Sequence, residues 1–397
     1  MSLAWLILKA VGIALLFLVV AVLLAATIVP RFLDRIYYQG PPSDHFDGAR
    51  FFNPDGDEDT LRPTPATSAQ PRGRLGFFAR YLLGNDGRPD WPDAVEVAPS
   101  TPPERVGGER MLVTWVGHAT LLIQTQGLNI LTDPVWSDRA GPLGFGPRRA
   151  APPGVRFDDL PPIDLVLVSH NHYDHLDLAT LRRVWARDRP RIVTSLGNDS
   201  IIRQAGATAT ALDWGGRVAV APGVEVVATR AHHWGSRWFT DRKRALWSGF
   251  VIRMPGGNVF FSGDSGMGDG LWPAAAAALG PVRLALIPIG AFRFVEGQMG
   301  SGSHIGPVDA VEVHRRLGAT MSLPIHWGTF RLSYEAWDTP PRLLEMAMEC
   351  TGQTGFAAVK HGEPVEVPPY RAPAPVAEMP RDTLLTCLAA NGAGALK

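Results

Sequence analysis

Four potential metal ligands lie within six residues of the sequence, in the segment His170-Asn-His-Tyr-Asp-His175. Imidazole nitrogens and carboxylate oxygens are donors that zinc and other transition metals accept in proteins. A loop at the end of a strand can turn His170 and His172 toward one metal while Asp174 and His175 face a second. An isolated histidine is usually a core or surface residue, but this spacing is far more specific. The segment therefore predicts a metal centre.

Three other strand-like runs also end in residues that can bind a metal. Loops at the same ends of neighbouring strands converge, so together the four segments could supply seven ligands to one cleft. A carboxylate can bridge two ions through its two oxygens, which is the role expected for Asp264. Nitrogen and oxygen ligands without thiolate suit two Zn²⁺ ions, with iron or manganese as alternatives. The runs and the residues that follow them are Val224–Ala231 with His232 and His233, Asn258–Ser262 with Asp264, and Thr320–Pro324 with His326.

The elements that must position these residues begin at Met111. Short apolar, β-branched runs predict a hairpin-rich start, and strands and helices alternate later in the chain. This mixture predicts an α/β fold with two sheets covered by helices, and not a single doubly wound sheet. The other predicted strands are Met111–Val116, Ala119–Thr125, Leu128–Thr132, Asp164–Ser169, Arg191–Ser195, Gly249–Met254 and Leu284–Ile287, and the predicted helices are Leu176–Arg187, Leu271–Leu279, Val308–Leu317 and Pro340–Thr351.

The N-terminus is unlike that of a soluble protein, because Lys9 is the only charged side chain between Leu3 and Val29. The uncharged run from Val11 to Val29 alone approaches the ~20 residues that cross a bilayer, so the segment predicts an uncleaved transmembrane helix. A cleaved signal peptide and a buried core helix are the alternatives. One lysine precedes the span, whereas Arg31 and Arg35 follow it. The excess of positive charge after the span favours a cytoplasmic catalytic domain.

The chain divides into four predicted parts: an anchor at 1–30, a linker and covering segment at 31–105, a catalytic domain at 106–365 and a Pro/Ala-rich C-terminal tail at 366–397. The linker is rich in Pro, Gly and Asp. Within it, the apolar stretch Leu75–Leu83 either packs on the domain or touches the membrane. The tail is expected to be partly disordered because of its Pro-rich sequence.

Composition excludes several classes of protein. The formal net charge is +0 and the sequence pI is about 7.2, so no basic field would attract nucleic acid. Cys350 and Cys387 are too few for a disulfide framework or a cysteine-rich metal site. Any metal must therefore be held by histidine and carboxylate.

The sequence resembles the metallo-β-lactamase superfamily and, more narrowly, the family of N-acyl-phosphatidylethanolamine-hydrolysing phospholipases D. The similarity covers roughly residues 111–341 and implies an αββα sandwich, here preceded by a transmembrane helix. The segments that carry it are Thr114–Thr120, Leu131–Pro134, Gly146–Arg149, Leu160–Asp164, Ser169–Asp177, His233-Trp234, Ile287–Ala291 and Ala319–Phe330.

The resemblance also implies roles for individual residues. It places His170, His172 and His233 on one metal, Asp174, His175 and His326 on the other, and Asp264 between them. His233 is preferred to His232 because it directly precedes Trp234. His118 and Asp133 would orient ligands, with ordinary turn and capping roles as the alternative, and His304 would contact the scissile phosphate and take part in catalysis. Arg237 is a second candidate for phosphate binding, because a guanidinium offers a fork of donors, and an ordinary surface arginine is the equal alternative.

The function that the resemblance implies is hydrolysis of N-acyl-phosphatidylethanolamine to phosphatidate and N-acylethanolamine, a phospholipase D reaction in lipid metabolism. The expected partners are a phospholipid substrate and the membrane, with no nucleic acid, and the sequence leaves open whether the chain forms a homodimer. A lactonase or other ester hydrolase is one alternative, because the ligands do not distinguish phosphorus from carbon as the target. A non-catalytic, membrane-tethered metal-binding protein is another.

Overall fold

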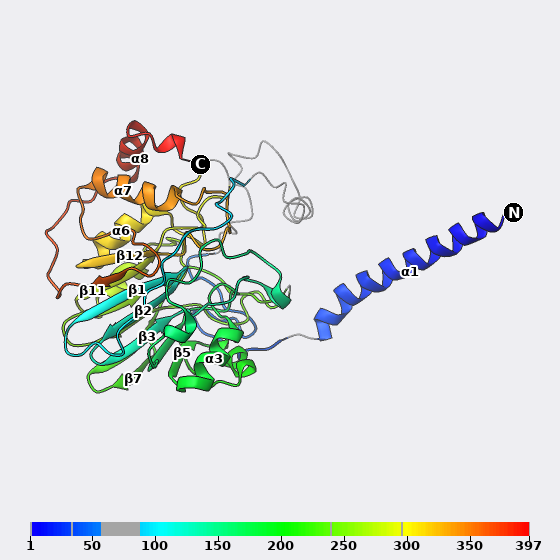
Figure 1. The fold of residues 1–397 in the computed structure, drawn as a ribbon, viewed down its shortest axis with the longest axis horizontal. Coiled ribbons are helices and arrows are strands. Elements are labelled where there is room, and N and C mark those ends of the chain that lie inside the picture. Colours follow the sequence, from blue (N-terminus) through cyan, green and yellow to red (C-terminus); the bar gives the residue numbers. More distant parts are fainter. Residues whose placement is uncertain (1, 33–34, 57–87, 239, 295–296, 397) are drawn as a thin grey trace.

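The computed structural model describes residues 2–32, 35–56, 88–238, 240–294 and 297–396. Two mixed β-sheets pack face to face, with helices on both outer faces (Figure 1). The core between the sheets consists of apolar side chains that alternate along the strands, and a second apolar cluster fills the space between the first sheet and its covering helices. The predicted α/β class and αββα sandwich are confirmed.

The first sheet has seven strands in the order β13-β1-β2-β3-β4-β5-β6. Strands β1 to β3 are antiparallel neighbours, whereas β3 to β6 run parallel to one another. The parallel strands therefore all begin at one end of the sandwich and all end at the other. The strands are β1 Met111–Gly117, β2 Thr120–Thr125, β3 Leu128–Thr132, β4 Leu165–Val168, β5 Arg191–Ser195, β6 Thr210–Leu212 and β13 Pro364–Glu366.

The second sheet has six strands in the order β12-β11-β10-β9-β8-β7. Its strands β10, β11 and β12 are parallel, and β7 to β10 are joined in antiparallel pairs. The strands are β7 Arg217–Ala221, β8 Val224–Thr229, β9 Gly249–Arg253, β10 Asn258–Phe261, β11 Val282–Pro288 and β12 Met321–Ile325.

Helices close both outer faces of the sandwich. On the first sheet, α3 begins at Asp177, whose carboxylate accepts hydrogen bonds from the backbone N–H groups of Ala179 and Thr180. On the second sheet, α6 and α7 each end at a glycine in the left-handed conformation, Gly318 and Gly352. The helices of the domain are α3 Leu178–Asp188, α4 Asn198–Ile202, α5 Trp272–Ala277, α6 Pro307–Leu317, α7 Thr339–Thr351 and α8 Arg381–Ala390.

The C-terminal tail is more ordered than its sequence suggests. Helix α8 lies beside α7 and buries Leu384 and Leu388. A disulfide bond between Cys350 and Cys387 joins the two helices. The sequence predicts a partly disordered tail, because two buried leucines in ten residues are a weak signal and cysteine pairing depends on tertiary proximity.

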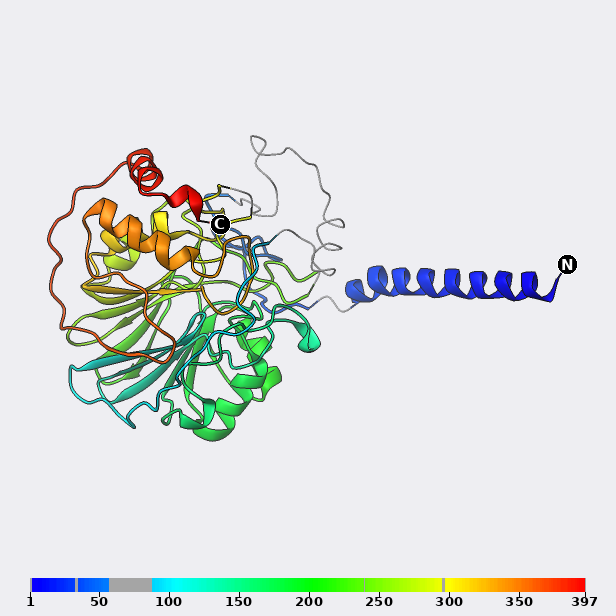
Figure 2. The same ribbon diagram turned by 45° about the horizontal axis from the view of Figure 1, so that its top comes forward.

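Helix α1, Leu3–Phe32, extends away from the body of the protein (Figure 2). Residues Leu3–Ala25 are long and apolar enough to cross a membrane, and none of this apolar stretch is buried against the rest of the protein. Length and composition thus agree with the predicted span. The apolar stretch Leu75–Leu83 lies outside the described residues.

Candidate metal centre

The predicted ligands meet at one edge of the sandwich, because each follows the end of a strand. His118 follows β1, the segment 170–175 follows β4, and His326 follows β12; loops after β8 and β10 contribute the others. Within the described residues the donor atoms form two main groups, each with atoms within 4.8 Å of one another. The groups are His170, His172, His233 and Asp264, and His118, Asp174, His175 and His326.

The first group is oriented by hydrogen bonds behind its imidazole rings. The Nδ1 atom of His233 lies 2.9 Å from the carbonyl oxygen of Ser303, so a proton on Nδ1 leaves Nε2 free to bind a metal. The Nδ1 atom of His170 lies 2.9 Å from the Ser169 hydroxyl. Both Nε2 atoms lie 3.8 Å from Oδ2 of Asp264. The free nitrogens therefore point toward the same carboxylate.

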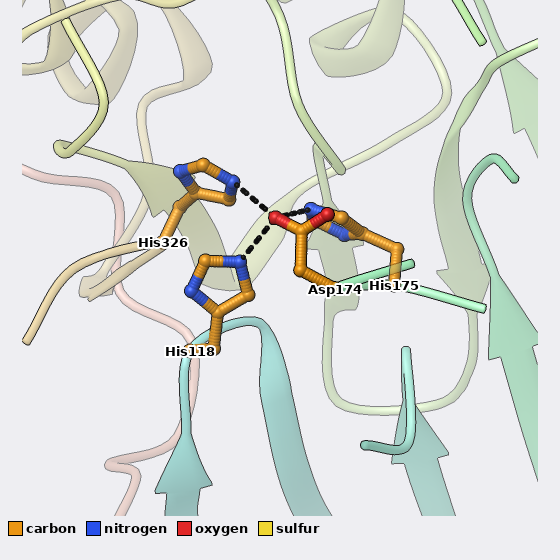
Figure 3. Close-up of side chains that lie close together, drawn as sticks. All are labelled: His118, Asp174, His175 and His326. Carbon is orange, nitrogen blue, oxygen red and sulfur yellow. Dashed lines mark hydrogen bonds and ion pairs between the residues drawn. The ribbon is translucent and has the colours of Figure 1, made fainter. Parts of the chain in front are cut away.

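The second group surrounds Asp174 (Figure 3). Its Oδ2 atom lies 2.9 Å from Nε2 of His118, 3.4 Å from Nε2 of His326 and 3.5 Å from Nε2 of His175. The Nε2 atoms of His175 and His326 are each 3.0 Å from Oδ2 of Asp264. Asp264 thus lies between the two groups, which is the position expected of a bridging ligand.

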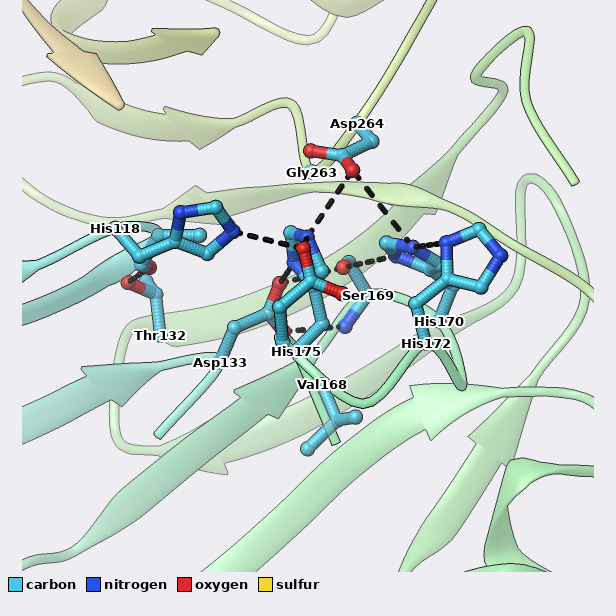
Figure 4. A network of polar contacts seen from close by, with 12 residues as sticks. His118, Thr132, Asp133, Val168, Ser169, His170, His172, His175, Gly263 and Asp264 are labelled. Atoms are coloured by element: carbon cyan, nitrogen blue, oxygen red, sulfur yellow. Dashed lines mark hydrogen bonds and ion pairs between the residues drawn. The ribbon is translucent and has the colours of Figure 1, made fainter. Parts of the chain in front are cut away.

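Asp133 holds the metal-binding loop from below (Figure 4). Its carboxylate accepts hydrogen bonds from the Ser169 backbone N–H at 2.7 Å and from the Ser169 hydroxyl at 2.6 Å, and its Oδ2 lies 2.6 Å from Nδ1 of His175. A proton on Nδ1 of His175 leaves the opposite nitrogen, Nε2, free for a metal. The geometry matches the orienting role expected for Asp133. Ser169 was not singled out from the sequence, since a serine at a strand end carries no distinctive signal.

The backbone is strained where the ligands leave the strands. His118, Asp133 and His326 have φ values of 55°, 32° and 64°, a region that non-glycine residues rarely adopt. Such conformations cost of order 1–3 kcal/mol each and persist only where the surrounding structure enforces them. Their clustering at this edge is typical of a functional site.

Burial and charge set the protonation of the site. Burial lowers the pKa of His170 and His233 well below the ordinary value and that of His172 to about 4. These imidazoles are neutral at pH 7, as metal ligation requires. Burial opposes the charged form of His326 as well, but Asp264 and Asp174 outweigh it and raise the pKa of His326 to about 9. A positive charge is therefore favoured between the carboxylates of Asp174 and Asp264.

Several buried polar atoms in the cluster have no hydrogen-bond partner among the described residues. They include Nε2 of His172 and Oδ1 of Asp264. A buried polar atom without a partner costs about 1–3 kcal/mol. Because these atoms converge and comprise nitrogen and oxygen without thiolate, the residues fit transition-metal ions as the missing partners.

The structure places the three remaining candidate histidines at different positions around the cluster. Nδ1 of His304 lies 3.9 Å from Oδ2 of Asp264, which places His304 at the cluster. His118 contacts the candidate ligand Asp174 directly, at 2.9 Å, which is the contact expected of a residue that orients a ligand. His232 turns away from the ligands toward Asp55, which leaves His233 as the ligand of that pair.

Arg237 supports the metal-binding loop from outside. Its Nη1 donates hydrogen bonds to the carbonyl oxygens of Asn171 and Leu176, at 3.0 and 2.7 Å. Its guanidinium carbon lies 3.9 Å from the ring centroid of Tyr173. These contacts hold the loop that carries four ligands. They engage Nη1 of the arginine with its own chain, and phosphate binding by the rest of the guanidinium stays a prediction.

Residues 128–327 match the family described as the Beta-lactamase superfamily domain. The chain therefore belongs to the metallo-β-lactamase superfamily and is a hydrolase of that fold. It is similar to the N-acyl-phosphatidylethanolamine-hydrolyzing phospholipase D 1 of Caenorhabditis elegans, with 36% identity over 272 residues that cover 64% of this chain and 75% of the relative. The resemblance drawn from the sequence is confirmed.

Two other similarities agree. The mitochondrial N-acyl-phosphatidylethanolamine-hydrolyzing phospholipase D of Saccharomyces cerevisiae is 33% identical over 245 residues, which are 60% of this chain and 52% of that protein. Igni18, a metallo hydrolase from the archaeon Ignicoccus hospitalis, superposes with a TM-score of 0.51 at 21% identity and covers 65% of this chain and 98% of its own. The second similarity supports the fold alone.

Proposed function

We propose that this protein is a membrane-anchored dizinc phosphodiesterase that hydrolyses N-acyl-phosphatidylethanolamine-type phospholipids to N-acylethanolamine and phosphatidate. The observation that carries the proposal is the position of Asp264, within 3.0–3.8 Å of histidines from both ligand groups. The similarity to relatives named for this reaction supports the substrate class.

One ion would be held by His170, His172 and His233. The other would be held by Asp174, His175 and His326, and Asp264 would bind both ions. Two such ions supply an activated water at neutral pH and neutralise charge on a phosphoryl group. Neighbouring His175 and His326 keep the pKa of Asp264 well below the ordinary value despite burial, so the carboxylate is ionised, as metal binding and a hydrogen bond from the attacking water require.

His304 adds a second polar group beside the reacting position. Burial lowers its pKa to about 3, so the imidazole is neutral at pH 7. A neutral imidazole can still donate an N–H hydrogen bond to a phosphoryl oxygen, and this bond would strengthen as charge develops there. His304 would thus stabilise the transition state without carrying a charge itself.

Hydrolysis of a lactone or another carboxylic ester is the second enzymatic candidate, because the same water could attack a carbonyl carbon. A non-catalytic, membrane-tethered metal-binding protein would be indicated by loss of ligands, yet all seven proposed ligands are present. A product assay separates these candidates. Purified, metal-loaded protein would be offered phospholipids, N-acylated phospholipids, lactones and RNA, with the products read by mass spectrometry. The proposal expects N-acylethanolamine and phosphatidate; turnover of lactones alone would contradict it.

The proposed anchor confines the enzyme to the surface where its substrate lies and so raises the effective concentration. Lys9 lies in the first third of α1, where its side chain can reach the interface. We expect the mature protein in the membrane fraction with the apolar segment still attached. Recovery in the soluble fraction, with a new N-terminus near Thr27, would instead indicate a cleaved signal peptide.

The disulfide bears on the membrane side of the catalytic domain. The positive charges favour the cytoplasmic side, but the bias is two arginines against one lysine. The bond between Cys350 and Cys387 favours an oxidising compartment, because disulfides are rare in the reducing cytosol. We infer that the domain lies on the oxidising side. An alkaline phosphatase fused at the C-terminus should then be active; an inactive fusion, with thiols that react in intact cells, would place the domain in the cytoplasm.

A further inference from the structure

Residues 35–56, here called the N-terminal strap, connect the anchor to the catalytic body. The sequence predicted only a linker and covering segment in this region. In the structure the strap is fixed at two ends, and its middle packs through Phe46 and Phe51 against Leu246 and Trp247. The C-terminal end contacts loops that carry proposed metal ligands directly, and the N-terminal end reaches another such loop through Asp241 and Arg237.

The C-terminal end of the strap contacts the loop after β8. The Asn53 side-chain amide donates a hydrogen bond of 2.9 Å to the carbonyl oxygen of His233, and Nε1 of Trp247 donates to Asn53 Oδ1 at 3.2 Å. Two residues later, Oδ2 of Asp55 lies 2.9 Å from Nδ1 of His232. The strap thus holds the backbone of one ligand and the side chain of its neighbour.

The carboxylate of Asp55 also reaches the loop after β10. It accepts hydrogen bonds from Nη2 of Arg230 at 2.6 Å and from the backbone N–H of Asp269 at 2.7 Å. Arg230 completes the contact with an ion pair of 2.9 Å to Asp269. No side chain fits between the two loops here: a Cβ atom on Gly268 would lie 2.4 Å from both Asp55 Oδ2 and His232 Nδ1. One carboxylate therefore joins the loop of His233 to the loop of Asp264.

The N-terminal end of the strap reaches the third ligand-bearing loop through two intermediates. The Tyr37 hydroxyl donates a 2.7 Å hydrogen bond to Asp241, and Asp241 accepts one from the backbone N–H of Arg237 at 3.0 Å. Arg237 in turn holds the carbonyl oxygens of Asn171 and Leu176. Tyr37 lies five residues after the end of α1, a distance of at most ~18 Å for extended chain.

We propose that the N-terminal strap is part of the metal centre, with Asp55 as a positioning residue that fixes the spacing of His233 and Asp264. The strap would thereby connect the anchor to the ligands themselves. The inference concerns metal binding and holds whichever ester the enzyme cleaves.

The test compares Asp55→Ala with a matched control in the same strap. Asp47 is exposed, and its carboxylate accepts hydrogen bonds only from the N–H groups of Ala49 and Arg50 among the described contacts, so Asp47→Ala removes an aspartate without touching the ligand loops. Full-length proteins in nanodiscs would be titrated with Zn²⁺ against a competing chelator. Loss of a group hydrogen-bonded directly to a metal ligand costs about 10–100-fold in affinity, and Asp55 acts one contact further out, through His232, Arg230 and the Asp269 N–H, so the lower end of this range applies.

We expect Asp55→Ala to raise the Zn²⁺ dissociation constant by about 10-fold and to alter the absorption spectrum of the Co²⁺-loaded protein. Asp55→Asn keeps an acceptor for the Asp269 N–H and should recover part of the affinity. Asp47→Ala should bind Zn²⁺ like the unaltered protein. Wild-type affinity and an unchanged Co²⁺ spectrum in both Asp55 variants, or an equal loss in Asp47→Ala, would overturn the proposal. The product assay that tests the proposed function does not depend on this result, so the two proposals can fail separately.

Discussion

Replacing Asp264 by asparagine is expected to reduce turnover by at least about 100-fold, the upper range for groups that only support metal ligands. The carboxylate is buried and lies within 3.8 Å of His170, His175, His233 and His326. Asparagine keeps the shape but offers one oxygen and no charge, so it cannot hold two ions as a carboxylate does. Steady-state kinetics on N-acyl-phosphatidylethanolamine vesicles would measure the loss.

The matched control for this variant is Asp159→Asn. Asp159 pairs with the exposed Arg156 at the surface, where an ion pair contributes about 0–1 kcal/mol, and turnover should not change. Circular dichroism should show native secondary structure in both variants. Near-normal turnover of the Asp264 variant would show that the bridging assignment is wrong.

Removal of the metal is expected to abolish turnover and to lower the stability of the domain. Elemental analysis of the purified protein should find about two transition-metal ions per chain, as in other two-metal hydrolases. A ligand at 1,000 times its dissociation constant stabilises the folded state by about 4 kcal/mol, so chelation should lower the thermal midpoint measurably. The effect should be large here because the buried donors then have no partners.

Adding zinc, iron or manganese back should restore both turnover and the thermal midpoint. Comparison among the three metals would also identify which ion gives the highest turnover. Protein that contains no transition metal when purified, and that none of the three activates, would contradict the two-metal centre.

The sequence predicted the site more completely than it predicted the fold. Ligands at strand ends could be recognised because four chemically unusual residues follow β4, and the histidines and aspartate after β8, β10 and β12 repeat the same pattern. Strand β7, Arg217–Ala221, is not predicted although Gly215-Gly216 and Pro222-Gly223 flank it, because it is a short edge strand without a fully buried residue and so has a weak apolar signal. Short β6 and β13 depend on pairing with neighbours distant in sequence.

Contacts between distant segments were also beyond the sequence. Nothing in the spacing of Asp55 and His232 indicates that they lie 2.9 Å apart, since 177 residues separate them. The same is true of Tyr37 and Asp241, and of the paired cysteines. Arg237 is a further example, because only the folded structure reveals that its Nη1 donates hydrogen bonds to two backbone carbonyl groups of the histidine-rich loop.

The bond that the enzyme breaks is tested most directly by turnover of N-acyl-phosphatidylethanolamine in ¹⁸O-labelled water. Attack on phosphorus places solvent oxygen on the phosphate, whereas attack on an acyl carbonyl places it on a carboxylate. We predict ¹⁸O in phosphatidate and unlabelled N-acylethanolamine, as analysed by mass spectrometry of both products. Labelled fatty acid with an intact phosphodiester would contradict the phospholipase D assignment. It would indicate that the same metal centre hydrolyses carboxylic esters.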